Sequence, residues 1–561
     1  MRLFCYLFCG ALFSVRSSSS IVDPNPHFAD MWNEDLTEVE AEEMVVTSGK
    51  IPSFLSGTLV RNGPAQFQSL HRNFTWAFDG LAKLCSWSFE RRGPNANYTI
   101  PIFRSAFIRS KTFNKTRKDK KFPKMMTVGD VVPKYGLRDG IMPLHDNVNV
   151  NVWKFTDDAT NAMTLTDSVD SVNFDPVSLS TKGIQDWSND TLKKTEISCG
   201  HPHIEPNTNG TSLINYALAV NPMGNVTINM YKMGKDHIRK PFGIYKNGVT
   251  FTPYIHSFSV TNRYVILLVY PTAYNMMCMI MGKPMHECME WKGRTVKTQV
   301  VVFDLFSQDP DAEPVFVSEV EAFHSQHHIN AYEVETKKGK VQIVLDLCAY
   351  ASPKFWTSKY PFGEFTVMTN QTARNQVGGF GTLRRLKITF STATEAVTNA
   401  KGSVQVIDIP VKDKLGNIYT VDFPFINRGA GHGGLDGKHY CTFFALSPRA
   451  RNSTEWADWA IVQVNMCHSK NGVNAKVWFE PQQYPGEPIF VPEDIHTLNE
   501  NGVLLINVLD GIKETSYLQI LNATTLTSVA RIDHRTKHSL PYMQHAAFFT
   551  NDRAFLETRG K

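Results

Sequence analysis

The sequence predicts an all-β protein built as one large domain with long loops. Short runs rich in β-branched and aromatic residues recur from about Ile51 onward, separated by turns rich in Gly, Asn, Asp and Pro. Helical periodicity of useful length is scarce, and no Pro- or Ser-rich linker divides the chain. The 561 residues are 42% apolar and 20% charged, which is sufficient for a large buried core.

The first residues have the pattern of a secretory signal. Arg2 supplies a basic start, Leu3–Val15 an apolar run and Ser17–Ser20 small residues. The apolar run is shorter than the roughly 20 residues that a membrane span needs, and no later segment is long enough. We therefore expect a signal at residues 1–20, a single domain at residues 21–561, and a secreted or ER-lumenal protein. An uncleaved N-terminal anchor is the alternative.

Sequons and cysteines agree with the secretory route. Two of the nine cysteines lie in the signal, and the other seven include no CxxC pair, which argues against a zinc ribbon and against a fold held mainly by disulfides. A few bridges are expected, but their pairing is not readable from the sequence. Nine Asn-X-Ser/Thr sequons predict a glycoprotein; they lie at Asn73, Asn97, Asn114, Asn189, Asn209, Asn225, Asn370, Asn452 and Asn522.

Six strands are the easiest to predict, because β-branched and aromatic residues concentrate in them. They are Tyr264–Tyr270, Thr298–Phe303, Val341–Leu347, Ala460–Val464, Val503–Leu509 and Tyr517–Leu521. No repeat occurs at a fixed spacing, so periodicity alone does not predict a propeller. The net charge of +5 is small for this length, which excludes nucleic acid as an expected partner.

Two segments depart from the strand-and-turn pattern. Lys111–Lys124 carries seven Lys or Arg residues with one Asp, and we interpret it as a solvated loop, with adhesion to an anionic surface as the alternative. Met276–Met281 is dense in methionine. Such a run either packs adaptably in the core or forms an exposed apolar patch that contacts a membrane or an apolar ligand.

Four of the eighteen histidines stand out by context: His201, His256, His327 and His545. Each by itself is better explained as a structural histidine. Their wide spacing excludes a local zinc-finger site, and the chain has no HExxH helix. Neutral imidazole does bind iron, copper and zinc, so spacing leaves a metal site open.

Several motifs in the same order resemble those of the carotenoid cleavage oxygenases, in the animal branch that includes β-carotene-cleaving enzymes and the visual-cycle retinoid isomerase. The resemblance covers the whole chain after the signal. It rests on Gly57–Pro64, Phe78–Gly80, His201–Glu205, His256–Phe258, His327–Glu333 with Leu345–Cys348, Tyr484–Val491 and the segment around His545.

The resemblance implies a seven-bladed β-propeller whose long loops form a cap over an iron site. It implies Fe(II) bound by His201, His256, His327 and His545, with no catalytic side chain beyond the metal site. Carboxylates are then expected to accept the other ring N–H of three ligands. By motif, these are Glu487, Asp167 and Asp422.

Aspartate at two of these positions is a departure, since the family normally has glutamate at both. Aspartate is one methylene shorter, so we expect it to reach through a water, to shift the ring, or to leave the ring unsupported, which predicts a slower enzyme or altered chemistry. His203 and His328 do not align with ligand positions, and we interpret them as structural.

The function that the resemblance implies is an Fe(II)-dependent dioxygenase. It would use O₂ to cleave a conjugated double bond of a carotenoid into apocarotenoid aldehydes, with central cleavage of β-carotene to retinal as the expected reaction. A retinoid isomerohydrolase and a secreted carotenoid- or retinoid-binding protein with a weakened iron site are the alternatives, and a zinc hydrolase is a distant fourth reading.

Membrane contact is expected through Met276–Met281, which falls where relatives have an apolar patch near the tunnel mouth. Relatives also carry a Pro-Asp-Pro-Cys-like motif after the strand that is Phe107–Arg109 here. This chain has Lys111–Lys124 there instead, with no cysteine for lipidation.

Overall fold

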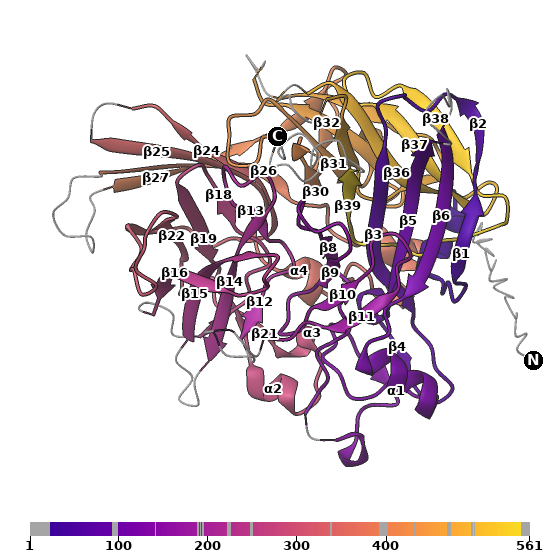
Figure 1. Cartoon of the computed structure of the whole chain (residues 1–561), viewed down its shortest axis with the longest axis horizontal. Helices are drawn as coiled ribbons and strands as arrows, with labels where there is room; N and C mark the ends of the chain where they lie inside the picture. The colour runs from indigo at the N-terminus through magenta and orange to yellow at the C-terminus, as the bar shows by residue number, and fades with distance from the viewer. Residues whose placement is uncertain are drawn as a thin grey trace, which may run out of the picture.

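The computed structural model describes residues 23–91, 99–140, 142–187, 190, 192, 196–220, 226–246, 251–336, 339–391, 402–429, 434–467, 473–494, 498 and 500–550. The expected signal at residues 1–20 and the sequons at Asn97, Asn189 and Asn225 lie outside these residues. Strands dominate the described chain, and the few helices are short (Figure 1). The all-β prediction is therefore confirmed, while the seven-bladed arrangement stays a prediction.

The two ends of the chain meet in two sheets, so the fold is closed by pairing between its first and last strands. One sheet has the order β1-β6-β5-β3-β39, in which β39 pairs antiparallel with β3. The other has the order β2-β38-β37-β36-β34, with β35 also paired to β36. The bounds of these strands are β1 (Val39–Glu43), β2 (Val45–Gly49), β3 (Gly57–Gln66), β5 (Leu81–Arg91), β6 (Thr99–Phe107), β34 (Gln483–Pro485), β35 (Ile489–Pro492), β36 (Gly502–Asp510), β37 (Thr515–Asn522), β38 (Ser528–Asp533) and β39 (His545–Thr550).

Three further sheets follow between residues 151 and 320, with the orders β11-β10-β9-β8, β12-β14-β15-β16 (β13 also on β14) and β18-β19-β22-β23. Their strands are β8 (Asn151–Trp153), β9 (Ala162–Leu165), β10 (Val172–Phe174), β11 (Thr181–Ile184), β12 (Ile197–Ser198), β13 (His203–Ile204), β14 (Ser212–Val220), β15 (Val226–Gly234), β16 (Lys240–Tyr245), β18 (Ser259–Val260), β19 (Tyr264–Val269), β22 (Thr298–Asp304) and β23 (Phe316–Val320).

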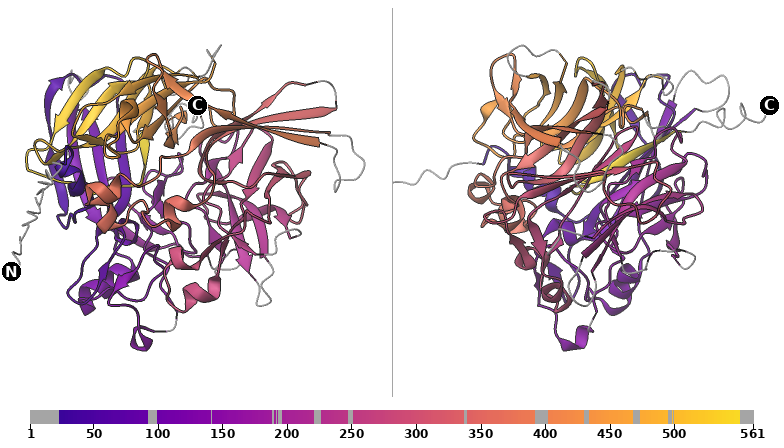
Figure 2. Two further views of the ribbon diagram at one scale, coloured as in Figure 1. Left: turned by 180° about the vertical axis from the view of Figure 1, so that it is seen from behind. Right: turned by 90° about the vertical axis from the view of Figure 1, so that its left-hand side faces the viewer.

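Two sheets follow in the second half, with the orders β24-β25-β26-β27 and β29-β28-β33-β32-β31-β30. The long hairpin of β25 and its neighbours projects from one side of the body, which both the front and back views show (Figures 1 and 2). The strands are β24 (His324–Val334), β25 (Lys340–Tyr350), β26 (Thr382–Ser391), β27 (Gly402–Ile409), β28 (Val411–Asp413), β29 (Ile418–Tyr419), β30 (Asp422–Phe425), β31 (Thr442–Ser447), β32 (Ala460–Asn465) and β33 (Val473–Trp478).

All six strands predicted from the sequence are present, as β19, β22, β25, β32, β36 and β37. The apolar residues that predict them are buried: every residue of β19 is inaccessible or nearly so, as in a sheet covered on both faces. Two small sheets, β4 (Asn73–Phe74) with β7 (Val131–Val132) and β17 (Thr252–Pro253) with β20 (Thr272–Tyr274) and β21 (Met289–Trp291), complete the pairing of the named strands.

Helices α1, α2 and α3 lie towards one end of the molecule, below the sheets in Figure 1, whereas α4 lies near its middle. The α-helices are α1 (Lys111–Asp119), α2 (Met276–Ile280), α3 (Met285–Cys288), α4 (Lys354–Thr357), α5 (Phe365–Met368) and α6 (Gln371–Arg374), and the 3₁₀ turns include η1 (Pro26–Trp32), η2 (Ala77–Asp79), η3 (Leu137–Asp139) and η5 (Ala450–Asn452). None of the helices within the described ranges is long and apolar enough to cross a membrane.

Helix α1 corrects the interpretation of Lys111–Lys124 as a loop. The Ser110 hydroxyl accepts a hydrogen bond from the backbone N–H of Phe113, which caps the helix. The carboxylate of Asp146 accepts the backbone N–H groups of Lys111 (2.6 Å) and Thr112 (3.1 Å). A distant carboxylate therefore satisfies the first turn, which no local pattern indicates. The basic side chains of α1 itself face solvent, as the sequence predicts, whereas Lys124 beyond the helix is buried and donates to the Ile280 carbonyl.

The described chain contains two disulfides, whose pairing could not be predicted from the sequence. Cys278 of α2 bonds to Cys288 of α3, and Cys441 bonds to Cys467. The three free cysteines of the described chain, Cys85, Cys199 and Cys348, are buried. The bridges link residues 10 and 26 positions apart, so each closes a local loop and neither holds distant sheets together.

Candidate metal centre

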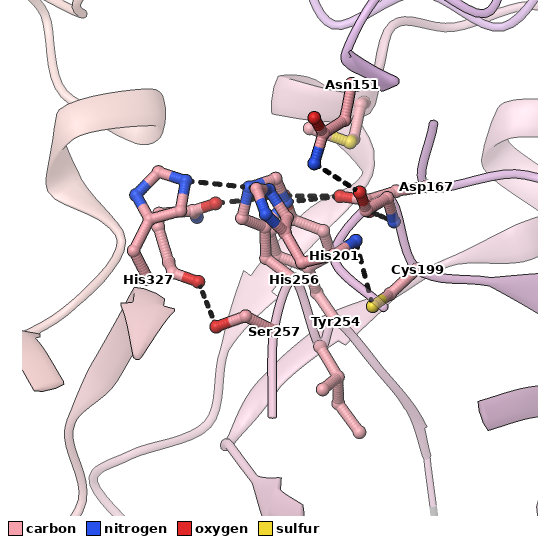
Figure 3. A network of polar contacts seen from close by, with 12 residues as sticks. Asn151, Asp167, Cys199, His201, Tyr254, His256, Ser257 and His327 are labelled. Carbon is pink, nitrogen blue, oxygen red and sulfur yellow. Dashed lines mark hydrogen bonds and ion pairs between the residues drawn. The ribbon is translucent and has the colours of Figure 1, made fainter. Parts of the chain in front are cut away.

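The structure brings the four predicted histidines together. One ring nitrogen from each lies within 4.8 Å of the other three. The Nε2 atoms of His201 and His256 are 3.0 Å apart, and those of His256 and His327 are 3.2 Å apart. Figure 3 shows these three rings converging on one point. Side chains separated by up to 344 positions in the sequence thus share one small volume.

Each histidine reaches the cluster from the end or an irregular part of a strand. His201 lies between β12 and β13, His256 lies just before β18, and His545 opens β39. His327 lies inside β24, where the register with β25 shifts on both sides of His328. Such a bulge re-aims a side chain out of the regular alternation. It explains how His327 points into the cluster although both neighbours are also buried.

The predicted carboxylates contact three of the rings directly. Asp167 Oδ2 contacts His256 Nδ1, as Figure 3 shows. Asp422 Oδ1 lies 2.6 Å from His327 Nδ1, and Glu487 Oε1 lies 2.9 Å from His545 Nδ1. The expectation that the shortened carboxylates need a water or leave the ring unsupported is therefore wrong in this structure, because the backbone brings both aspartates close enough.

Backbone N–H groups also bind each of the three carboxylates. Gly200 N–H donates to Asp167 Oδ1 (2.9 Å), and Ala546 N–H donates to Glu487 Oε2 (3.1 Å). Both donors are direct neighbours of a cluster histidine. Ala546 follows His545, the ring that Glu487 contacts, whereas Gly200 precedes His201 and binds Asp167, the partner of His256. Phe423 N–H donates to Asp422 Oδ1 (2.8 Å). Hydrogen bonds of this kind hold a carboxylate in one orientation.

Two tyrosines that sequence reasoning missed complete these contacts. The Tyr350 hydroxyl donates to Asp422 Oδ2. The Tyr254 hydroxyl lies 3.2 Å from Asp167 Oδ2 and 3.1 Å from Gln326 Oε1. Tyr254 comes two residues before His256, and this closeness in sequence is the one feature that could have placed it at the site. Tyr350 is the last residue of β25, and no nearby sequence motif links it to the site, because only the pairing of β24 and β25 brings it near Asp422.

His203 and His328 lie outside the cluster, in agreement with their structural interpretation. His203 contacts Asp436 through Nδ1 (3.0 Å) and the Phe258 carbonyl through Nε2 (2.9 Å). His328 contacts the hydroxyls of Ser259 and Tyr270, each at 2.8 Å. Both ring nitrogens of each residue thus have partners, so neither offers a free lone pair.

The donor set fits a cation. The carboxylates take the Nδ1–H of His256 and His327, which leaves a lone pair on each Nε2, and these lone pairs face each other across 3.2 Å. Two facing lone pairs repel unless a positive charge lies between them. Burial lowers the pKa of His201 and His545 well below the ordinary value, and the neighbouring imidazoles act in the same direction. Neutral rings are the form that binds metal.

A large apolar cavity opens on one side of the cluster. It spans about 1290 Å³, including the open space at its mouth, and reaches His256, His327 and His545. The surface of its walls is mainly apolar and includes many aromatic and methionine side chains, as in sites for apolar ligands. Among the lining residues are Met125, Met279, Met285, Tyr254, Tyr274, Phe355, Trp356, Phe362, Phe380 and Phe423.

A second cavity of about 1430 Å³ lies against His201, His327 and His545. Its lining includes Lys154, Arg428 and Asp436 and is more polar than that of the first cavity. The histidine cluster therefore stands between an apolar and a more polar space. An apolar compound therefore fits the first cavity better than the second.

The comparisons with known proteins agree with this geometry. The family model described as RPE65, retinal pigment epithelial membrane protein, matches residues 33–550. Human β,β-carotene 15,15'-dioxygenase is 24% identical over 549 residues, covering 89% of this chain and 90% of that protein. The carotenoid isomerooxygenase of Galleria mellonella is 23% identical, covering 92% and 96%.

Solved structures show the same fold. Cobalt-substituted Synechocystis ACO has a TM-score of 0.71 at 20% identity and covers 94% of this chain and 98% of its own. An ACO/RPE65 chimera gives the same score, identity and coverage. The family model spans nearly the whole described chain. The chain therefore belongs to the RPE65 family, the carotenoid cleavage oxygenases that its motifs resemble.

Proposed function

We propose that this protein is an iron-dependent oxygenase that cleaves a conjugated double bond of a carotenoid. The observation that carries the proposal is the junction of four clustered imidazoles with a large, mainly apolar cavity. The named functions of the human and Galleria relatives support the substrate class. We further propose β-carotene as substrate and central cleavage to retinal as the reaction.

In this proposal His201, His256, His327 and His545 hold Fe(II), and bound iron supplies the activation of O₂. Asp167, Asp422 and Glu487 keep three rings in the Nδ1–H form and hold their orientation. The aromatic walls bind the polyene and exclude water. The position of the substrate along this cavity then decides which double bond lies beside the cluster.

Product analysis tests the proposal. Iron-loaded protein is incubated with β-carotene and with other carotenoids, with and without O₂, and the products are separated by chromatography. We expect aldehydes only with both iron and O₂. Iron-loaded protein that leaves every carotenoid intact would refute the proposal, and turnover of a retinyl ester without O₂ would indicate an isomerohydrolase instead.

We propose that the methionine-rich helices contact a membrane. Met279 and Met285 line the apolar cavity, whereas Met277 and Met281 are 65% and 68% exposed. Helix α1, whose basic side chains are exposed, lies at the same end of the molecule as α2 (Figures 1 and 2). An apolar rim beside basic residues suits a bilayer with anionic head groups, from which a carotenoid would enter directly.

We propose that the protein follows the secretory pathway, with residues 1–20 removed. The two disulfides support an oxidising compartment. Five of the described sequon asparagines, Asn73, Asn114, Asn209, Asn370 and Asn452, are exposed and thus accessible to glycosylation. Mass spectrometry of protein made in a secretory host tests this, and an intact Met1 with no glycans would contradict it.

A further inference from the structure

A second group of metal-binding side chains lies where the N-terminal and C-terminal parts of the chain meet. Glu42 lies in β1, His534 follows β38, and His538 lies four residues further on. One ligand atom from each lies within 4.8 Å of the other two. The segment that carries both histidines leads into β39, so the group connects the first strand to the last; β1 and β38 lie at the same edge in Figure 1.

His534 is buried without a hydrogen-bond partner. Its side chain has an exposed fraction of 0%, and its ring lies edge-on to Phe103 with centroids 4.4 Å apart. Neither ring nitrogen forms a hydrogen bond within the described part of the chain. The nearest carboxylate oxygen, Glu42 Oε2, lies 3.8 Å from Nδ1. Buried polar groups nearly always have a partner, so this ring points to an additional ligand.

The Glu42 carboxylate is fixed toward the two histidines. Its Oε1 accepts the backbone N–H groups of Arg535 (2.6 Å) and Thr536 (2.9 Å), which orients the group. Its Oε2 then lies 2.8 Å from His538 Nε2 and 3.8 Å from His534 Nδ1. Tetrahedral zinc with bonds of about 2.0–2.1 Å separates its ligand atoms by about 3.3–3.4 Å. The distances from Glu42 Oε2 to the two histidine nitrogens, 2.8 Å and 3.8 Å, lie on either side of this ligand–ligand separation.

A purely structural interpretation explains only part of the group. The bond between Glu42 and His538 closes the loop without any metal. It gives no partner to either nitrogen of His534. We propose that Glu42, His534 and His538 bind a zinc ion, which ties β1 to the segment leading into β39. Two imidazoles and one carboxylate are a common zinc ligand set, with water in the fourth position.

The protonation states agree with this proposal. Burial lowers the pKa of His534 to about 4, so its lone pair is free at neutral pH. Burial acts to raise the pKa of Glu42, but hydrogen bonds from Thr536 and His538 outweigh it and lower that pKa. The carboxylate is therefore ionised.

Two other groups in the described chain with similar geometry do not carry such a proposal. In one, His439 lies beside Cys441 and Cys467, whose sulfurs are already joined in a disulfide. In the other, His286 Nδ1 donates to the Val128 carbonyl, and Lys134 lies beside the Asp130 and Glu287 carboxylates. Only the group at Glu42 has a buried ring without a partner.

Elemental analysis of the iron-loaded, full-length protein tests the proposal. The protein is incubated with Zn²⁺, freed of unbound metal, and analysed for zinc and iron together. The variants are His534→Phe, which fills the same space against Phe103, and Glu42→Gln, whose amide oxygen still accepts the two backbone N–H groups. His71→Ala, at an exposed position, is the control.

We expect the wild type and the control to hold about one zinc per chain more than either variant, with equal iron in all four. Zinc is also expected to raise the Tm of the wild type and the control but not of the variants. Equal zinc in the wild type and either variant, no retained zinc in the wild type, or a loss of zinc that follows a loss of iron would each overturn the proposal.

Discussion

Asp422 illustrates how closely one residue is matched to the site. The residue is 3% exposed, and its carboxylate accepts hydrogen bonds from His327 Nδ1, the Phe423 N–H and the Tyr350 hydroxyl. These three contacts give both carboxylate oxygens a partner. Burial acts to raise its pKa, but His327 and Tyr350 outweigh it, so the pKa is lowered and the group stays charged. The sequence shows only that the residue is short; the structure shows that a short residue fits.

Replacing Asp422 by the longer family residue should therefore weaken the site. Asp422→Glu adds a methylene where the carboxylate already contacts His327 at 2.6 Å, and overpacking of this kind costs about 1–3 kcal/mol. We expect iron to bind on the order of tenfold more weakly, measured by competition with a chelator. Asp408→Glu on the solvent-facing side of β27 is the control. Tighter iron binding in Asp422→Glu would contradict this account.

The tyrosine hydroxyls should also matter for the metal. Tyr350→Phe removes the donor to Asp422 Oδ2 and leaves a buried carboxylate oxygen without its partner. We expect a loss of roughly tenfold in iron affinity with unchanged circular dichroism. Tyr332→Phe, whose ring packs against His439 outside the site, serves as the matched control. An affinity equal to that of the control would show that the Tyr350 hydroxyl does not position Asp422.

At the scale of elements, the sequence predicts strands well and their irregularities poorly. The run Val341–Leu347 is recognisable because β-branched and other apolar residues concentrate in it, and Ile343–Leu347 are buried. The bulges opposite it in β24 aim His327 at the cluster, and they depend on pairing with β25 that no local pattern encodes. The disulfide between α2 and α3 is unreadable for the same reason, because seven cysteines allow many pairings.

Helix α2 supports a prediction about membranes. Met277→Ser combined with Met281→Ser removes two exposed apolar side chains and leaves the cavity-lining Met279 in place. We expect weaker binding to anionic phospholipid vesicles in a sedimentation assay, with unchanged Tm, because the lost area is solvent-exposed in the free protein. Leu415→Ser, at a position 85% exposed, is the control. Equal vesicle binding by all three proteins would contradict the proposed contact.

At the scale of the whole molecule, buried neutral histidines make stability depend on pH. Burial lowers the pKa of His324 to about 3, from the ordinary value of 6.5. Below pH 6.5 the unfolded chain binds a proton that the native ring does not. The stabilising contribution is therefore complete above pH 6.5 and is lost as the pH falls toward 3, by up to about 1.4 kcal/mol per pH unit.

His324→Gln should reduce this dependence. The side chain keeps hydrogen-bonding capacity toward Thr272 and Gln326 but does not titrate. Urea unfolding between pH 4 and 6 should show a slope of free energy of unfolding against pH that is shallower than that of the wild type. His71→Gln, which is exposed, should leave the slope unchanged. Equal slopes for wild type and His324→Gln would mean that this ring is protonated in the native state.

The closure of the molecule could not be read from the sequence. Strand β3 pairs with β39, nearly the full length of the chain away, and this pairing brings His545 to the other three histidines. Motif resemblance identified the ligands, because the motifs occur in order. The two cavities and the contacts of Tyr254 and Tyr350 are properties of the assembled sheets, so no stretch of sequence indicates them.

The iron content of purified protein tests the central claim, that the four-histidine cluster is the iron site of an oxygenase. Wild-type protein, His327→Ala and the exposed control His71→Ala are loaded with Fe(II), and bound iron and aldehyde formed from β-carotene are measured in the same samples. The account predicts about one iron per chain and aldehyde formation for the wild type and the control, and neither for His327→Ala. Equal iron and equal turnover in His327→Ala would contradict it.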